Sequence, residues 1–491
     1  MAVTRTQIPQ KQVDNTSAAY QVMEPRIRLM NTLMGGTEAM RAAGELYLPR
    51  YHAESLDNWR VRLQRATLLN YFQRTVESLV GRPFSKPVLI GDDMPPVLVS
   101  YAEDIDQQGT HLNVFCRRSF RDGLMKGLTH ILVDYPNILP AETPTKADES
   151  ALGARPYFVP IKNEDLIAAY AEVQNGVEVL THVRIRELQT MQSGYDEVTT
   201  ERIRVLEPGR WELWQKGSKK WEMVEEGVTS LPVIPLVTFY ADREDFMVAR
   251  PPLTDLGDLN ISHWQSNSDQ INVLTVTRFP ILAGAGVDEG DGVEGELKIG
   301  PNQYLTTRDH QGKFYYVEHT GKAIEAGRTH LEDLKQEMAV MVLELLQRPG
   351  NITATARAID TAENHSNLQA MVLMYADVVE RAFQYAAMWL GMKPEEAGSI
   401  SINTDFGIQL NEPSDLDTLF KSRQASEISH EAYVVELQRR GVLSDDYDVV
   451  VDQKLIDGER DKQLADLAMK AKMQQDGLLP PPSPLPPQPV V

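Results

Sequence analysis

The stretch from residue 251 to residue 279 reads PPLTDLGDLNISHWQSNSDQINVLTVTRF and decides how the rest of the chain is interpreted. Its apolar residues recur every three to four positions, as on one buried face of an α-helix: Leu253, Leu256, Leu259, Trp264, Ile271 and Leu274. The middle of the stretch, from Ser262 to Gln270, is mostly polar. A helix with so polar a middle does not belong in the core of one protomer, so we expect neighbouring subunits or water at its sides.

A second long helix is predicted to return after a small β segment. The segment 281–317 has the pattern of short hairpin strands, and a helix is predicted over 324–346. Five apolar residues of this helix are spaced three and four apart, as in a heptad seam: Leu331, Leu334, Met338, Met341 and Leu345. The residues 348–360 break the pattern, and a third long helix is predicted over 361–390.

The first 250 residues contain a block of predicted helices followed by a block of predicted strands. Apolar periodicity predicts one helix over 55–80 and another over 112–126, and then a short buried strand over 130–135. From residue 156 to residue 240 the period is two, which indicates an antiparallel meander that ends with the strand 235–240. Helices and strands in separate blocks favour an α+β fold over an alternating α/β fold.

The last hundred residues are predicted to be helical and charged. Short helices are expected over 416–428 and 431–440, and a longer charged helix over 452–472. Half of the residues from 478 to 491 are proline, which is typical of an extended or disordered tail.

Composition and charge exclude several classes of protein. The 491 residues carry 49 basic and 70 acidic side chains, for a formal charge of −21. This charge disfavours a conventional DNA-binding protein, whereas a negative surface repels phosphates and allows a duplex to slide past. No stretch approaches the roughly 20 apolar residues that cross a bilayer, and the start of the chain has no signal-peptide pattern. The single cysteine, Cys116, excludes an internal disulfide framework.

The common catalytic and metal-binding motifs are absent from the sequence. Gly321-Lys322 is followed by Ala323 rather than the Ser or Thr of a phosphate-binding loop, and His430-Glu431 does not continue as HExxH. The acidic loop 288–296 departs from the EF-hand pattern because Gly290 and Gly292 stand at ligand positions. We therefore predict no catalytic residue, no metal and no cofactor.

The order of long helix, small β segment, returning helix, broken loop and third long helix resembles that of tailed-bacteriophage portal proteins, the head-to-tail connectors. Short stretches near both ends of the chain strengthen the resemblance. The residues that carry it are LGDLNISHW at 256–264 with Ser268-Asp269, RPGNITATA at 348–356, Tyr47-Leu48-Pro49, Leu69-Asn70, VGRPFSKP at 80–87, ISHEAY at 428–433 and LQRRG at 437–441.

The resemblance implies a portal fold with named regions. The wing is expected at 1–250, with a long wing helix at 361–391. The stem consists of one helix at 251–278 and another at 321–347, joined by a small β clip at 279–320. A channel loop at 348–360, an α-helical crown at 392–477 and a Pro-rich disordered tail at 478–491 complete the chain.

The resemblance also implies a function in the virion. Portal subunits form a ring of about twelve copies at one capsid vertex, through which double-stranded DNA is packaged and ejected. The expected partners are the terminase large subunit, head-completion, adaptor or tail proteins, and the major capsid and scaffold proteins. DNA passes without sequence-specific binding, no membrane is involved, and assembly takes place in the host cytoplasm. The ring is not an enzyme.

Three groups of site residues follow from this resemblance. The channel loop brings Arg348, Asn351, Thr353, Thr355 and Arg357 to the DNA, and the clip carries an acidic group formed by Asp288, Glu289, Asp291, Glu294 and Glu296. Packing between stem subunits is expected from Leu331, Leu334, Met338, Met341, Leu345 and Trp264. Two alternatives stay open from the residues: an acidic α+β hydrolase or nuclease, and another ring or adaptor protein of a virion.

Overall fold

The computed structural model describes residues 13–136, 153–218, 220–278, 281–285, 311–317, 321–344, 367–404, 413–425, 427–439, 442–443, 447 and 449–475. The chain divides into two compact units, one ending at Phe406 and one beginning at Gly407. The first unit combines a helical block with antiparallel sheets, which confirms the predicted α+β class.

The helical block begins with four helices, and one prediction about it is wrong. They are α1 (Ala18–Met34), α2 (Gly36–Ala43), α3 (Leu56–Arg65) and α4 (Tyr71–Gly81). The sequence predicts one helix over 55–80, but Ala66 is extended and α3 ends there. Asn70 then starts α4, because its side-chain oxygen accepts a hydrogen bond from the backbone N–H of Gln73 at 2.9 Å. Apolar residues continue across the break, so the periodicity alone does not reveal it.

Helix α6 (Leu112–Lys126) has the bounds that the sequence predicts. The Nδ1 atom of His111 accepts a hydrogen bond from the backbone N–H of Asn113, which caps the start of the helix. Gly127 ends the helix with a φ of 88°, a left-handed conformation that glycine adopts without a steric penalty. A shorter helix, α5 (Pro96–Tyr101), precedes α6.

A three-stranded antiparallel sheet forms the centre of the first unit, in the order β3 (Tyr157–Ile161), β2 (Leu128–Asp134) and β9 (Leu236–Tyr240). The sequence places the last of these strands in the meander, whereas the structure pairs it with β2. Helices α6 and α11 (Asn367–Trp389) pack on this sheet through a cluster of aromatic rings. Phe120, Phe239 and Tyr375 have centroids 5.2 to 5.8 Å apart.

The predicted meander is confirmed as a separate five-stranded sheet. Its strands follow chain order: β4 (Leu166–Gln174), β5 (Val177–Ser193), β6 (Asp196–Glu207), β7 (Arg210–Lys216) and β8 (Trp221–Val228). Trp221 is buried against Ile203 and Val205, which fits inter-strand packing. The first unit also contains small two-stranded ribbons. One pairs β10 (Arg243–Asp245) with β11 (Val248–Ala249), and another pairs β1 (Leu89–Ile90) with β14 (Ile400–Ser401).

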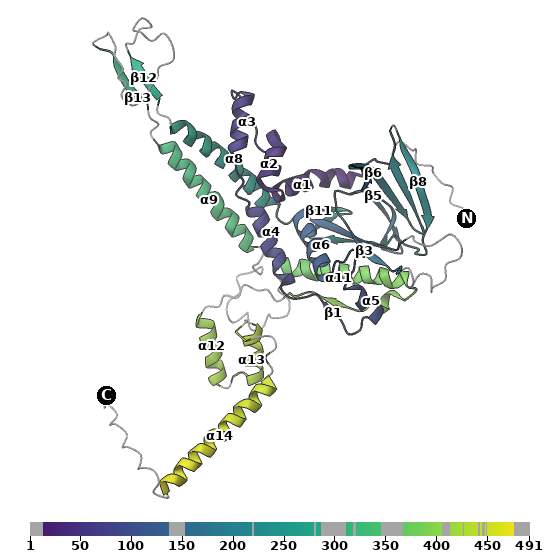
Figure 1. Ribbon diagram of the computed structural model, residues 1–491, viewed down its shortest axis with the longest axis vertical. Helices are drawn as coiled ribbons and strands as arrows, with labels where there is room; N and C mark the ends of the chain where they lie inside the picture. Colours follow the sequence, from purple (N-terminus) through teal and green to yellow (C-terminus); the bar gives the residue numbers. More distant parts are fainter. Residues whose placement is uncertain are drawn as a thin grey trace. The chain divides into compact units, whose positions relative to one another are not determined.

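The predicted helix–hairpin–helix order is also present. Helix α8 (Thr254–Thr277) leads into β12 (Ile281–Ala285), and β13 (Lys313–Val317) returns to α9 (Lys322–Glu344). Figure 1 shows α8 and α9 lying side by side and running away from the sheets, with the β12–β13 hairpin beyond their far ends. The chain then returns to the sheets in α11.

The second unit contains three helices in the described residues. They are α12 (Pro413–Gln424), α13 (His430–Arg439) and α14 (Val449–Gln475), close to the predicted ranges. The residues 392–404 lie within the first unit, where β14 pairs with β1.

Candidate functional site: a helical pair anchored to the N-terminal helices

Helices α8 and α9 are joined along their length by apolar and polar contacts. Met338 of α9 has no exposed surface, and Leu331 and Leu334 are also buried. The Nε2 atom of Gln270 donates a hydrogen bond to the backbone oxygen of Ile324 at 2.9 Å. Gly327 permits this close approach, since a Cβ atom at its position would lie 2.2 Å from the Oε1 atom of Gln270.

Much of the predicted heptad seam is buried within a single chain. Leu331, Leu334 and Met338 are at most 9% exposed within a single chain, and Trp264 is fully buried in its main apolar core. Met341 is partly buried against the same core, and Leu345 lies outside the described residues. Met338 and Trp264 have no exposed surface with which to contact a neighbouring subunit, and packing between subunits by the other predicted residues stays a prediction.

Three side-chain amides of α8 bind the chain's own N-terminal segment. Asn260 is fully buried, and its side-chain amide bonds to the backbone of both Leu69 and Phe72. The Nε2 atom of Gln265 donates to the backbone oxygen of Tyr47 at 3.0 Å. One further amide, that of Asn267, donates to the backbone oxygen of Thr67 at 3.2 Å. These bonds account for the amide side chains of α8.

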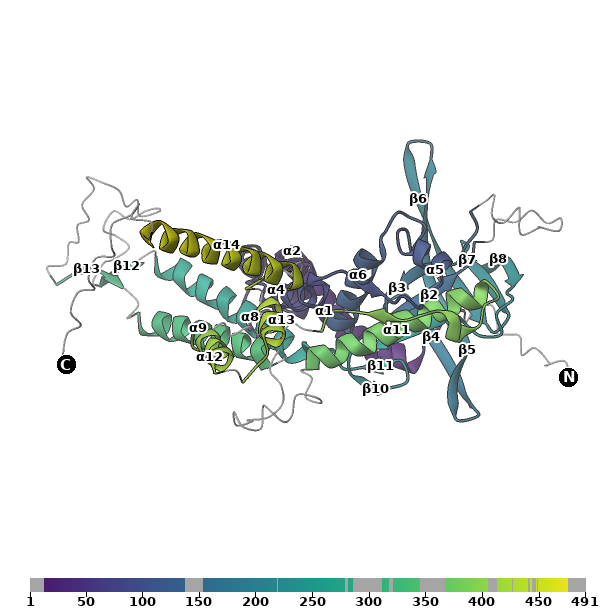
Figure 2. The same cartoon turned by 90° about the horizontal axis from the view of Figure 1, so that it is seen from below.

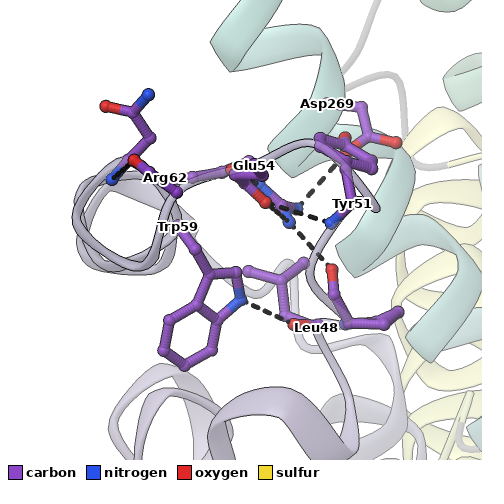
Figure 3. Close-up of polar contacts among 9 residues, drawn as sticks. Leu48, Tyr51, Glu54, Trp59, Arg62 and Asp269 are labelled. Carbon is purple, nitrogen blue, oxygen red and sulfur yellow. Dashed lines mark hydrogen bonds and ion pairs between the residues drawn. The ribbon is translucent and has the colours of Figure 1, made fainter.

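A buried arginine completes the attachment of α3 to α8 (Figure 3). The Arg62 side chain is 3% exposed and forms two hydrogen bonds with the Glu54 carboxylate, at 2.9 and 2.8 Å. The same guanidinium donates to the backbone oxygen of Pro49 at 2.8 Å and lies 4.2 Å from the centre of the Tyr51 ring. Asp269 of α8 receives a hydrogen bond from the Tyr51 hydroxyl and lies 3.6 Å from Arg62. We call these four side chains, Arg62, Glu54, Tyr51 and Asp269, the clamp.

The contacts within the clamp set the protonation states of Glu54 and Tyr51. The hydrogen bonds from Arg62 hold the pKa of Glu54 below its usual range, so this carboxylate stays ionised. Burial and the bond to Asp269 raise the pKa of Tyr51 to about 12, so its hydroxyl keeps its proton. The bidentate, charge-assisted pair of Arg62 and Glu54 therefore joins α3 to the loop before it, and Asp269 joins both to α8.

Helix α8 also buries polar groups that lack such bonds. Among the described residues, His263 and Ser268 are each 2% exposed and their side chains have no hydrogen-bond partner. Burial lowers the pKa of His263, and the nearby Lys335 of α9 lowers it further. The imidazole is therefore neutral at the pH of the cell.

The remaining predicted site residues are not part of this arrangement. The acidic group at 288–296 and the channel-loop residues Arg348 to Arg357 lie outside the described residues. Within the described ranges, no group of three or more His, Cys, Asp or Glu side chains is arranged to hold a metal ion. No helix in the part of the chain that the structure covers is both long enough and apolar enough to cross a membrane. Burial raises the pKa of the Cys116 thiol to about 12, so this thiol is unreactive.

The clamp could not be predicted from the sequence. Its one local signal is that Arg62 follows Trp59 by three positions, which places a charge on the buried face of the predicted helix. The partners Glu54 and Asp269 are separated by more than two hundred residues, and no sequence pattern connects them.

Comparison with known proteins gives one family match and several distant structural matches. Residues 252–390 match a domain of unknown function, DUF4055, a span from the start of α8 to the end of α11. No curated protein matches the chain. A chain from the virion of a native gene transfer agent (GTA) particle has a TM-score of 0.37 at 11% identity, covering 74% of this chain and 88% of that chain.

Two further structural matches are of the same kind. A chain from the neck of an empty GTA particle, computed with C6 symmetry, has a TM-score of 0.39 at 12% identity. A chain from the neck of a native GTA particle, computed with C12 symmetry, has a TM-score of 0.38 at 11% identity. Both matches cover 82% of this chain and 98% of the other. TM-scores below 0.5 do not establish the function of this chain.

Proposed function

We propose that this chain is the subunit of a portal ring, a non-enzymatic channel at one vertex of a virion through which double-stranded DNA enters and leaves. The observation that carries the proposal is the pair α8 and α9, which leaves the body of the first unit, ends in the β12–β13 hairpin and returns to the body in α11. This order matches the stem, clip and wing helix that the sequence resemblance implies.

The dimensions and attachment of the helical pair suit a channel wall. Helix α8 has 24 residues and α9 has 23. At 1.5 Å per residue, each is about 35 Å long. A wall beside moving DNA must resist shear, and the bonds from Asn260 and the clamp hold α8 to the N-terminal helices. The net charge of −21 repels phosphates and limits sticking of the duplex.

The regions keep the boundaries given by the resemblance. The stem is 251–278 with 321–347, the clip is 279–320, and the channel loop is 348–360. The wing is 1–250 with the helix 361–391, and the crown is 392–477. In this assignment the clip docks the terminase and later the head-completion or tail proteins, while Arg348 and Arg357 make transient phosphate contacts in the channel.

The experiment that tests the function is electron microscopy of the purified chain together with a nuclease assay. We expect class averages of a closed ring with a central hole, formed in the absence of DNA. We also expect no cleavage of duplex or single-stranded DNA with or without added Mg²⁺ or Mn²⁺. A small oligomer with metal-dependent cleavage would overturn the proposal in favour of a nuclease.

A further inference from the structure

The exposed face of α6 carries two arginines with no internal partner. Arg117 and Arg118 are exposed, and within the described residues neither side chain forms an ion pair or a hydrogen bond. Arg121 follows one turn later and pairs with Glu77 of α4 at 2.8 Å. Val114, which is 43% exposed, precedes them by one turn. Helical spacing places these four residues on one face, which is cationic with an apolar contact point.

The β10–β11 hairpin carries the opposite charge. Asp242, Glu244 and Asp245 are all exposed there. Glu244 is neutralised by Arg26 at 2.7 Å, and the Asp245 carboxylate accepts a hydrogen bond from the backbone N–H of Phe246. Within the described part of the chain, neither Asp242 nor Asp245 is ion-paired. Arg243 of the same hairpin pairs with Glu178 at 2.7 Å and also interacts electrostatically with Asp245, which leaves a net negative charge on the hairpin.

The two surfaces extend to different sides of α11. The base of the hairpin adjoins the end of α6, where the backbone N–H of Ala241 donates to the oxygen of Gly127 at 2.8 Å, and Figure 2 shows α6 on one side of α11 and the hairpin on the other. A ring built by rotation brings one flank of each subunit against the other flank of its neighbour, so its interfaces join two different surfaces. A cationic flank and an acidic flank at matching positions meet that requirement.

We propose that the α6 face of one copy binds the β10–β11 hairpin of the next copy, with Arg117 and Arg118 opposite Asp242 and Asp245. This inference rests on the proposed ring. Opposite charges fix the register of neighbouring copies and disfavour other pairings, which matters for a chain whose net charge of −21 otherwise drives copies apart. Because both flanks are exposed to solvent, the contact weakens as salt is raised.

The test reverses the charges on each flank and then on both. We expect R117E/R118E and D242R/D245R each to lower the fraction of chains in rings by at least about tenfold at micromolar concentration. Circular-dichroism melts should be unchanged, since the four side chains are exposed. The quadruple variant, which restores opposite charges across the contact, should recover ring assembly. K216E/K220E changes the net charge by the same amount as R117E/R118E, around the β7–β8 turn, and should assemble normally.

Each result separates this interface from the proposed function. Rings of wild-type protein that persist unchanged in R117E/R118E overturn the interface and leave the portal proposal standing. Rings that persist but no longer retain duplex DNA show that the α6 face binds nucleic acid, which also overturns it. A quadruple variant that stays disassembled overturns the pairing of these two faces. Wild-type protein that forms no ring overturns both proposals.

Discussion

The side-chain amide of Asn260 caps a helix that begins almost two hundred residues earlier in the chain. Its Oδ1 atom accepts a hydrogen bond from the backbone N–H of Phe72 at 3.0 Å, and its Nδ2 atom donates to the backbone oxygen of Leu69 at 2.9 Å. Phe72 is the second residue of α4, where a backbone N–H has no partner inside its own helix. Asn260 therefore supplies the hydrogen-bond acceptor that the Phe72 N–H lacks within its own helix. The same contact fixes α8 against the start of α4.

Replacing Asn260 by alanine is expected to destabilise the first unit by about 2–4 kcal/mol, because two buried backbone groups lose their partner. Chemical denaturation followed by circular dichroism measures the loss. Asn267→Ala is the matched control. It removes one bond, to the backbone oxygen of Thr67, from a more exposed position and should cost less than about 1 kcal/mol. Equal losses for the two variants would contradict the capping role of Asn260.

Replacing Arg62 by an uncharged residue should destabilise the protein, because the buried Glu54 carboxylate then has no cation beside it. The side chains of Arg62 and Glu54 are 3% and 8% exposed. We expect Arg62→Met to destabilise the protein by about 3–5 kcal/mol, the range for leaving one partner of a buried ion pair uncompensated. R62M/E54Q should lose less, since no buried charge remains. The control Arg60→Met removes a surface pair with Asp57 and should cost less than about 1 kcal/mol.

The buried His130 predicts a loss of stability on acidification. Complete burial lowers its pKa to about 3, against about 6.5 in an unfolded chain. The folded state therefore keeps a neutral imidazole, and the unfolded state gains the proton as the pH falls below about 6.5. The contribution of His130 to the free energy of unfolding is complete above that pH. About 2 kcal/mol of it is lost between about pH 7 and about pH 5.

Measuring the free energy of unfolding at several pH values in His130→Asn checks this sign. The variant is less stable overall, because His130 bonds to Thr238 at 2.9 Å, but its slope between about pH 5 and pH 7 should be flatter than that of wild type. His52→Asn, at an exposed position, should leave the slope unchanged. The burial of His182 and His263 lowers their pKa values as well, so some slope of the same sign remains.

Gly123 sets the distance between α6 and the central sheet. A Cβ atom at this position would lie 2.4 Å from the Cδ1 atom of Phe239. We expect Gly123→Ala to destabilise the protein by about 1–3 kcal/mol through overpacking, as measured by thermal unfolding. Gly81→Ala adds the same methyl group at the end of α4, where nothing lies within 4 Å, and should be neutral or slightly stabilising. An unchanged stability of Gly123→Ala would contradict this, because it would mean that the Phe239 ring moves to make room for the methyl group.

Much of the fold could be predicted from the sequence where local signals define an element. Helix α6 matches its predicted bounds because His111 and Gly127 act as caps at its two ends. The five-stranded meander follows from alternating residues and short turns, and the order of α8, hairpin, α9 and α11 follows from periodicity. Long-range pairing leaves no such signal, so the prediction that places β9 in the meander is wrong.

The candidate site was less predictable, because its partners are backbone groups far away in sequence. The polar residues of α8 indicate that something polar lies beside the helix, but the partners are carbonyls and amides of residues 47–72, which any residue type supplies. The same limit explains why the seam of Leu331 and Met338 was expected between subunits. Periodicity identifies a buried face and does not say whether the same chain or a neighbour covers it.

The measurement that tests the central claim most directly is the native mass of the purified full-length chain by light scattering. The chain mass is 55.2 kDa. A closed portal ring predicts one species of about twelve times this mass, with a mass that falls at high salt. A monomer or dimer at every salt and protein concentration, with scaffold and capsid proteins present as well as absent, would contradict the account.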